Sequence, residues 1–165
     1  MNSLTVYRRQ LNLLAFAATV ALLGLAYYLQ YLQGMDPCPL CMLQRLALAA
    51  VGIVFLLAAM HNPAGWGARV YGVGVLVTAA SGSAIAGRHL WLQSLPPEQV
   101  PACGPGLAYM MDVFPPMEVL QRVLAGSGEC AEVETVLGVT IPAWTLAAFL
   151  GFALVGLLAN WRRRA

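Results

Sequence analysis

The strongest structural constraint in this chain comes from residues 38–60, CPLCMLQRLALAAVGIVFLLAAM, where two cysteines precede a long apolar run. Between residues 42 and 60 the only charged side chain is Arg45. A helix of this length, at about 1.5 Å per residue, crosses a hydrocarbon layer of about 30 Å. Because lipid offers no hydrogen-bond partners, the backbone of such a run has to be helical. The run therefore predicts a membrane-spanning helix with a cysteine pair at its start.

Three further apolar runs flank this one, at residues 11–29, 70–90 and 141–159. Of the 165 residues, 60% are hydrophobic and 10% are charged, a balance that suits lipid rather than water as the solvent. We therefore predict an all-α fold, an integral membrane four-helix bundle. It would form a single membrane domain over residues 1–165, with a long outward loop at residues 91–140.

The first apolar run has an alternative interpretation as a cleaved secretory signal, because Arg8 and Arg9 precede it. The run ends in bulky residues, Tyr27 and Tyr28 among them, and no small-residue cleavage site follows. It is also longer than the apolar core of an ordinary signal. We expect it to remain as the first span.

The long loop contains too many prolines and glycines for a long helix, as in Pro96-Pro97, Pro115-Pro116 and Gly126-Ser127-Gly128. Within it, residues 117–124 carry apolar side chains at helical spacing, directly after a proline pair that suits a helix start. They predict a short amphipathic helix on the membrane surface.

Small residues mark places where the spans can approach one another closely. Gly72 and Gly74 lie near the start of the third span, and Ser81-Gly82-Ser83 lies in its middle. Side chains of this size are typical of helix–helix contacts in membranes. We expect these positions to face neighbouring helices.

Arginine placement predicts the orientation, because cytoplasmic segments of membrane proteins carry the positive excess. With four spans, both termini and the connection at residues 61–69 lie on one side. That side holds six of the nine basic residues: Arg8, Arg9, Arg69, Arg162, Arg163 and Arg164. We therefore expect cytoplasmic termini and outward-facing cysteine segments. The basic residues form no stripe of their own, so no nucleic-acid partner is expected.

All four cysteines fall in the outward segments; they are Cys38, Cys41, Cys103 and Cys130. Disulfides are permitted in an oxidising outer compartment. Four cysteines allow three pairings, and the spacing does not choose among them.

The position of Cys41 favours a reactive thiolate. Pro37 and Pro39 place the start of the second span near Leu40, so Cys41 lies in the first turn of a helix. Unpaired N–H groups and the helix dipole favour negative charge there. Arg45, four residues later, lies on the same helical face and adds a positive charge. An arginine at this depth is expected to have a partner, and the Cys41 thiolate is one candidate.

Other interpretations of these residues stay open. A structural disulfide between Cys38 and Cys41 would constrain the unfolded chain little, because the loop it closes is so short. A zinc site made from all four cysteines lacks the short spacing in its second pair, so no metal is expected. Arg45 is also compatible with a side chain that merely reaches the lipid interface.

Five motifs occur in order along the chain: Cys38-Pro-Leu-Cys41-x-x-Gln44-Arg45, Arg88-His89-x-x-Leu92-Gln93, Cys103-Gly-Pro, Gly126-Ser-Gly-Glu-Cys130-Ala and Ile141-Pro-Ala-Trp144-Thr. Together they resemble the bacterial disulfide bond formation protein B (DsbB) family. The resemblance covers about residues 30–150. One departure is that no tryptophan follows Cys130, which affects the expected loop structure rather than the chemistry.

The resemblance implies an enzyme of the bacterial inner membrane that reoxidises a periplasmic DsbA-like thiol oxidant, supports protein disulfide formation and passes electrons to the membrane quinone pool, as ubiquinone or menaquinone. It implies that Cys103 and Cys130 exchange with that oxidant, and that Cys103 is attacked first. It places Cys38 and Cys41 next to the quinone. The residues that would contact the quinone are Arg45, His89, Gln93 and Gln44; His89 and Gln93 share a face if their helix continues.

Two other classes of protein remain as alternatives. One is a redox enzyme of the vitamin K epoxide reductase type, which is also a four-helix membrane bundle with a CxxC motif. Arg45 and the Cys103–Cys130 motifs are the features that separate the two. The other alternative is a non-enzymatic membrane scaffold with structural disulfides in its loops.

Overall fold

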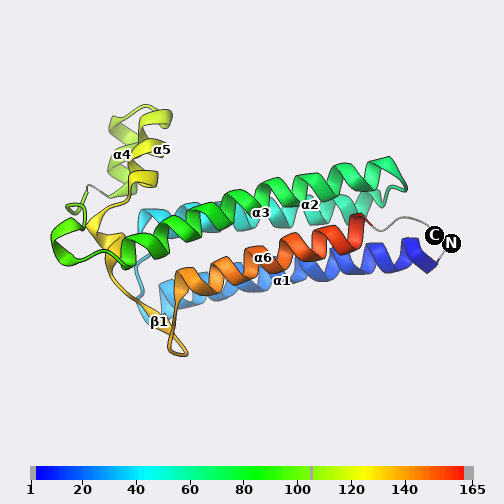
Figure 1. Cartoon of the computed structure of the whole chain (residues 1–165), viewed down its shortest axis with the longest axis horizontal. Helices are drawn as coiled ribbons and strands as arrows, with labels where there is room; N and C mark the ends of the chain where they lie inside the picture. Colours follow the sequence, from blue (N-terminus) through cyan, green and yellow to red (C-terminus); the bar gives the residue numbers. More distant parts are fainter. Residues whose placement is uncertain (1–2, 105, 162–165) are drawn as a thin grey trace.

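The computed structural model describes residues 3–104 and 106–161, and its body is a bundle of four long helices (Figure 1). These are α1 (Ser3–Gln33), α2 (Pro39–His61), α3 (Trp66–Gln93) and α6 (Ile141–Asn160). All four are long and apolar enough to cross a membrane. The predicted all-α membrane bundle is confirmed. Arg162, Arg163 and Arg164, which carried part of the orientation argument, lie outside the described residues.

The long helices include the predicted spans and extend beyond most of their ends. α1 has 31 residues and α3 has 28, so both continue past the apolar core of their segments. α2 begins at Pro39, as the proline pattern indicated, with Cys38 as its N-cap. The Cys38 sulfur accepts a hydrogen bond from the Cys41 backbone N–H at 3.4 Å, and this contact satisfies one of the free N–H groups of the first turn.

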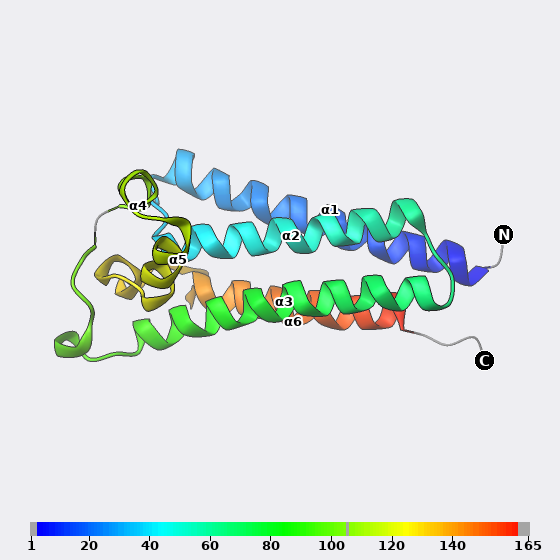
Figure 2. The ribbon, with the colours of Figure 1, turned by 90° about the horizontal axis from the view of Figure 1, so that it is seen from above.

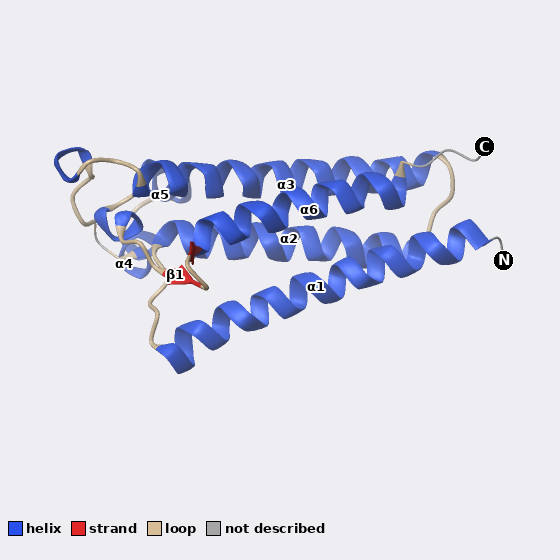
Figure 3. Ribbon diagram, turned by 60° about the horizontal axis from the view of Figure 1, so that its bottom comes forward, coloured by secondary structure: helices blue, strands red, loops and turns tan. Residues whose placement is uncertain are grey.

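The helices pack side by side, with α2 against α1 and α3, and α6 against α3 and α1 (Figure 2). The start of α1 and the end of α6 lie at one end of the bundle, and the cysteine-bearing segments lie at the other (Figure 1). Toward its C-terminal end, α1 diverges from the other three helices (Figure 3).

The core of the bundle is aromatic and tightly packed. Phe55, Phe149 and Phe152 are buried together with Val75. Gly82 makes room for one of these rings, because a Cβ atom built there would lie 2.3 Å from Cε1 of Phe149. Gly72 and Gly74 also allow close helix contacts. A Cβ atom built on Gly72 would lie 3.3 Å from Asn160, and one built on Gly74 would lie 3.3 Å from Val54. The expected role in close helix packing is confirmed for these three glycines, whereas Ser81 is exposed and its hydroxyl donates to the Val77 carbonyl of its own helix.

Buried polar side chains pair with one another inside the bundle. Asn12 of α1 and Asn160 of α6 exchange amide hydrogen bonds of 3.3 and 3.1 Å. Both side chains are almost completely buried. Unpaired amides would be costly at this depth, so the pair links these two helices in one register.

The loop between α3 and α6 is more structured than its composition indicated. It contains η1 (Pro97–Gln99), α4 (Leu107–Val113), α5 (Pro116–Ala125), η2 (Gly128–Ala131) and a hairpin of β1 (Thr135–Val136) and β2 (Val139–Thr140). α5 confirms the predicted short helix. α4 and the hairpin were not predicted. The hairpin turns through Leu137 and Gly138, whose φ angles are 55° and 79°, as a tight two-residue turn requires.

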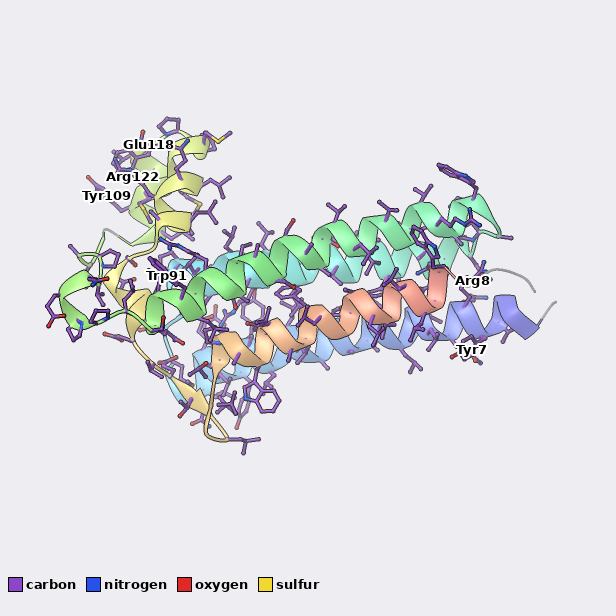
Figure 4. All side chains as sticks on the ribbon, viewed as in Figure 1. Tyr7, Arg8, Trp91, Tyr109, Glu118 and Arg122 are labelled. Atoms are coloured by element: carbon purple, nitrogen blue, oxygen red, sulfur yellow. The ribbon has the colours of Figure 1, made fainter. Side chains whose placement is uncertain are left out.

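The α4–α5 pair projects from the cysteine end of the bundle, where Tyr109, Glu118 and Arg122 mark its position (Figure 4). Glu118 and Arg122 form an ion pair of 2.7 Å along α5. Apolar side chains of α5, Met117, Leu120 and Leu124, are exposed. That these residues rest on a membrane surface stays a prediction.

Candidate functional site

The CxxC cysteines lie at the N-terminus of α2, within contact of each other. Their sulfurs are 3.3 Å apart, and Cys38 donates the hydrogen bond to Cys41. Cys38 is 9% exposed, whereas Cys41 is half-buried. All four cysteines of the chain are free thiols in this structure. The direction of the hydrogen bond makes Cys41 the acceptor of the pair.

His89 of α3 lies against both of these sulfurs. Its Nε2 is 3.8 Å from Cys38 Sγ, and its Nδ1 is 3.9 Å from Cys41 Sγ. Nδ1 also contacts the side-chain amide of Gln44 at 3.1 Å. Two of the residues predicted to contact a quinone are therefore beside the CxxC pair, and both are buried.

Cys130 is the third sulfur of this group. It lies in η2, is 0% exposed and packs in the same apolar cluster as Cys38. The contact with the Cys38 side chain, together with burial, raises the pKa of the Cys130 thiol. Both effects disfavour the thiolate form of Cys130.

Cys103 is the exposed member of the four. It lies against the segment that precedes Cys130, because a Cβ atom on Gly128 would come within 2.9 Å of Cys103 Sγ. The Gly128 N–H also donates to the Ala102 carbonyl at 3.4 Å. Gly128 thus allows the two cysteine segments of the loop to approach closely. From the exposed loop to the start of α2, neighbouring cysteines form a series of four sulfurs in the order Cys103, Cys130, Cys38, Cys41.

Arg45 has its partners in α1, on the side of the bundle where that helix splays away. Its guanidinium donates to the Gln30 side-chain oxygen and, over 3.0 Å, to the Ala26 carbonyl. It also lies 5.1 Å from the centre of the Tyr27 ring. The Arg45 guanidinium thus bonds to α1 and not to Cys41, which was one of its candidate partners.

Gln93 and Arg88 hold the segment that carries Cys130. Gln93 donates to the Glu132 carbonyl at 3.0 Å, on one side of Cys130. On the other side, Arg88 donates to the Leu124 and Ala125 carbonyls at 3.2 and 2.9 Å, at the end of α5. The end of α3 therefore fixes the Cys130 segment at two points. This is a different contact for Gln93 from the predicted one with a quinone.

A cleft lined by acidic side chains opens onto Cys38 and Cys41 from the loop side. Four of the seven acidic residues of the chain line it: Asp36, Glu129, Glu132 and Glu134. The lining also includes His89 and Gln93 of α3. Among the described residues, the donors placed close enough for a metal ion are Cys38, Cys41 and His89, within 4.8 Å of one another. That is one donor fewer than a structural zinc site uses, and neither Cys103 nor Cys130 is part of this set of three possible metal donors.

Two residues at this site have no functional assignment in the sequence analysis. Thr145, in the first turns of α6, donates to the Gln44 side-chain oxygen at 2.7 Å. Gly128 is the second, through its contact with Cys103. Thr145 lies within the Ile141-Pro-Ala-Trp144-Thr motif, and this was the one sign in the sequence that it could belong to the site. Nothing in its spacing relates it to Gln44, which is on another helix.

Comparison with known proteins identifies relatives over almost the whole chain. The family model for disulfide bond formation protein DsbB matches residues 8–159. A disulfide bond formation protein B of Hahella chejuensis is 55% identical over 157 residues, 94% of each chain. One of Nitrosococcus oceani is 51% identical over 150 residues, 90% of this chain and 87% of the relative. One of Chromobacterium violaceum is 48% identical over 162 residues, 98% of each chain. The matched region includes all four cysteines.

Proposed function

The chain belongs to the disulfide bond formation protein DsbB family, and on that basis we propose that it is a quinone-dependent thiol oxidase that reoxidises a DsbA-like dithiol protein. Family membership establishes the coarser role, a membrane protein that acts in disulfide formation. The observation that carries the finer proposal is the series of four sulfurs. It begins at exposed Cys103 and ends at Cys41, where α2 enters the membrane.

The first half of the proposed cycle is thiol–disulfide exchange in the loop. A thiolate of the partner attacks Cys103 in a Cys103–Cys130 disulfide, and Cys130 leaves with both electrons of the broken bond. Cys103 is the accessible sulfur, whereas buried Cys130 is shielded from a protein nucleophile. The second thiol of the partner then loses its proton and releases Cys103, which completes the oxidation of the partner.

The second half passes the electrons inward. The Cys130 thiolate attacks Cys38 in a Cys38–Cys41 disulfide, and Cys41 leaves with the electron pair. The packing of Cys130 against Cys38 favours this choice of sulfur. When Cys103 attacks Cys130 in the resulting Cys38–Cys130 bond, Cys38 leaves as a thiolate. The loop disulfide is restored, and Cys38 and Cys41 together hold two electrons.

The residues around Cys41 suit a quinone as the electron acceptor. A quinone supplies a planar conjugated ring with two carbonyl oxygens, and it becomes a quinol when it takes up two electrons and two protons. Arg45 is half-buried, lies one helical turn from Cys41 and has further N–H donors beyond the two engaged by α1. These donors would hold a carbonyl oxygen and stabilise negative charge that develops on it. Tyr27, beside Arg45, adds an aromatic surface.

The proposed setting is the bacterial inner membrane, with both termini in the cytoplasm and the cysteine loops in the periplasm. The coarse part of this proposal, a multi-pass membrane protein, follows from the four apolar helices. The placement of basic residues supports the orientation. An oxidising periplasm would allow the two disulfides of the cycle to form.

The proposed activity is tested with purified protein, a reduced dithiol protein of the DsbA type and ubiquinone or menaquinone. We expect one quinol for each disulfide formed in the partner, measured by quinone absorbance and by thiol trapping. Partner oxidation without quinol would show that a quinone is not the electron acceptor. If the cysteines stay oxidised when the dithiol partner is added, the proposal is wrong and the scaffold alternative gains support.

Replacing Arg45 with methionine should weaken quinone use while leaving partner exchange intact. Hydrogen bonds to charged groups contribute about 1.5–3 kcal/mol, so the quinone concentration for half-maximal turnover should rise about tenfold or more. Steady-state rates over a range of quinone concentrations provide the measurement. Arg69→Met, at the far end of the bundle, is the matched control. Equal kinetics in the Arg45 variant and wild type would rule out the role assigned to Arg45.

A further inference from the structure

A hydrogen-bonded chain of side chains runs from α6 through α2 and α3 to Cys38. The Thr145 hydroxyl donates to Gln44 Oε1 at 2.7 Å, and Gln44 Nε2 contacts His89 Nδ1 at 3.1 Å. His89 Nε2 then lies 3.8 Å from Cys38 Sγ. Gln44 is 3% exposed and His89 is 2% exposed, so water does not compete for these contacts. The chain joins three helices at the reactive end of the bundle.

The two ends of the Gln44 amide give this chain a direction. An amide oxygen only accepts hydrogen bonds, and an amide nitrogen only donates them. Because the oxygen receives the Thr145 hydroxyl, the nitrogen faces His89 and donates to Nδ1. A neutral imidazole that accepts at Nδ1 carries its proton on Nε2. That N–H is the one that faces the Cys38 sulfur.

We propose that Thr145 and Gln44 are positioning residues that hold His89 in the Nε2–H tautomer, so that the imidazole donates a hydrogen bond to Cys38 whenever that sulfur is a thiolate. The inference rests on the proposed function, in which Cys38 leaves a disulfide with Cys130. In that step Cys103 forms the new bond to Cys130, and the electron pair of the broken bond goes to Cys38. A donor already aimed at Cys38 stabilises the charge without rearrangement.

The reverse orientation of the same side chains makes the proposal testable. Thr145 also lies 2.9 Å from the Pro142 carbonyl, which could take its proton instead. Gln44 would then donate to Thr145, its oxygen would accept from Nδ1–H, and Nε2 would face Cys38 without a proton. The hydrogen bond from the Thr145 hydroxyl to Gln44 Oε1 therefore favours the Nε2–H tautomer over the Nδ1–H tautomer.

Nitrogen NMR of the reduced, full-length protein in lipid bilayers distinguishes the two tautomers. With 15N-histidine labelling in a His61→Gln background, the remaining histidine signals come from His89. We expect a protonated Nε2 and an unprotonated Nδ1. Thr145→Val should mix the tautomers, whereas Thr145→Ser should retain the wild-type pattern. The control is Thr78→Val, because among the described residues the Thr78 hydroxyl bonds to two carbonyls of its own helix, those of Gly74 and Val75.

The effect on Cys38 is measured as the equilibrium of the Cys38–Cys41 pair with glutathione, by thiol trapping and mass spectrometry. Loss of one donor to a thiolate should shift this equilibrium about fivefold toward the disulfide in Thr145→Val. A protonated Nδ1 in the wild type, or an unchanged tautomer in Thr145→Val, would overturn the proposal. So would a shifted tautomer with an unchanged equilibrium. Neither readout uses a quinone, so failure of the quinone assay alone would leave this inference standing.

Discussion

Replacing Cys38 with alanine should abolish oxidation of the dithiol partner, with a fall in turnover of about a thousandfold or more, as is typical when a residue that forms a covalent intermediate is removed. Cys38 has contacts with three groups of the proposed cycle: Cys41 at 3.3 Å, His89 at 3.8 Å and the buried Cys130. Cys38 therefore lies between the buried loop cysteine and Cys41. Turnover is measured as quinol formed with the reduced dithiol protein.

Cys103→Ala supplies the comparison that makes this result specific. It should also fail with the protein partner, because the exposed sulfur is lost. With a small dithiol such as dithiothreitol, however, it should still turn over, since the cleft opens directly onto Cys38 and Cys41. Cys38→Ala should be inactive with both reductants. Appreciable quinol formation by Cys38→Ala would contradict the proposed order of sulfurs.

The largest effect on stability is expected at Gly82, in the middle of α3. In Gly82→Ala the new methyl group would lie 2.3 to 2.7 Å from three atoms of the Phe149 ring. Phe149 is 1% exposed and lies in the core cluster, so a shift of the ring would disturb the side chains packed around it. Overpacking of this kind typically costs about 1–3 kcal/mol, and we expect a loss of free energy of unfolding near the upper end. Thermal or denaturant unfolding in detergent measures it.

Gly87→Ala is the matched control, because it lies in the same helix and a Cβ atom there meets nothing within 4 Å. It should be neutral or slightly stabilising, since alanine favours helix more than glycine does. Gly82→Ala combined with Phe149→Leu should recover part of the loss, because the smaller side chain vacates the contact. Equal losses for Gly82→Ala and Gly87→Ala would mean that helix packing is not the cause.

The number of spans and the start of α2 were predictable from the sequence because both depend on local rules. A long apolar run has to be helical in lipid, and Pro39 suits the first turn of a helix. The same reasoning predicted α5 from apolar spacing after a proline pair. α4 is only 7 residues long and carries no comparable pattern. The hairpin turn at Leu137 lacked the residue types that usually indicate one.

In the candidate site, too, the features that depend on local sequence were predictable and the contacts between helices were not. The cysteines were identified from the sequence because their chemistry is intrinsic, and Cys41 follows from its place at a helix start. The partners of Arg45 could not be identified from the sequence, because Gln30 and Ala26 lie on a different helix whose path is set by packing.

Gln93 and Thr145 show why the rest required the tertiary structure. Helical periodicity places Gln93 on the face of His89, yet its amide binds the Glu132 carbonyl in the loop. Thr145 reaches Gln44 across 101 positions in the chain. Residue types and spacing determine which groups can react and where helices begin. Which groups meet depends on how the helices pack, because a hydrogen bond between distant residues leaves no local pattern in the sequence.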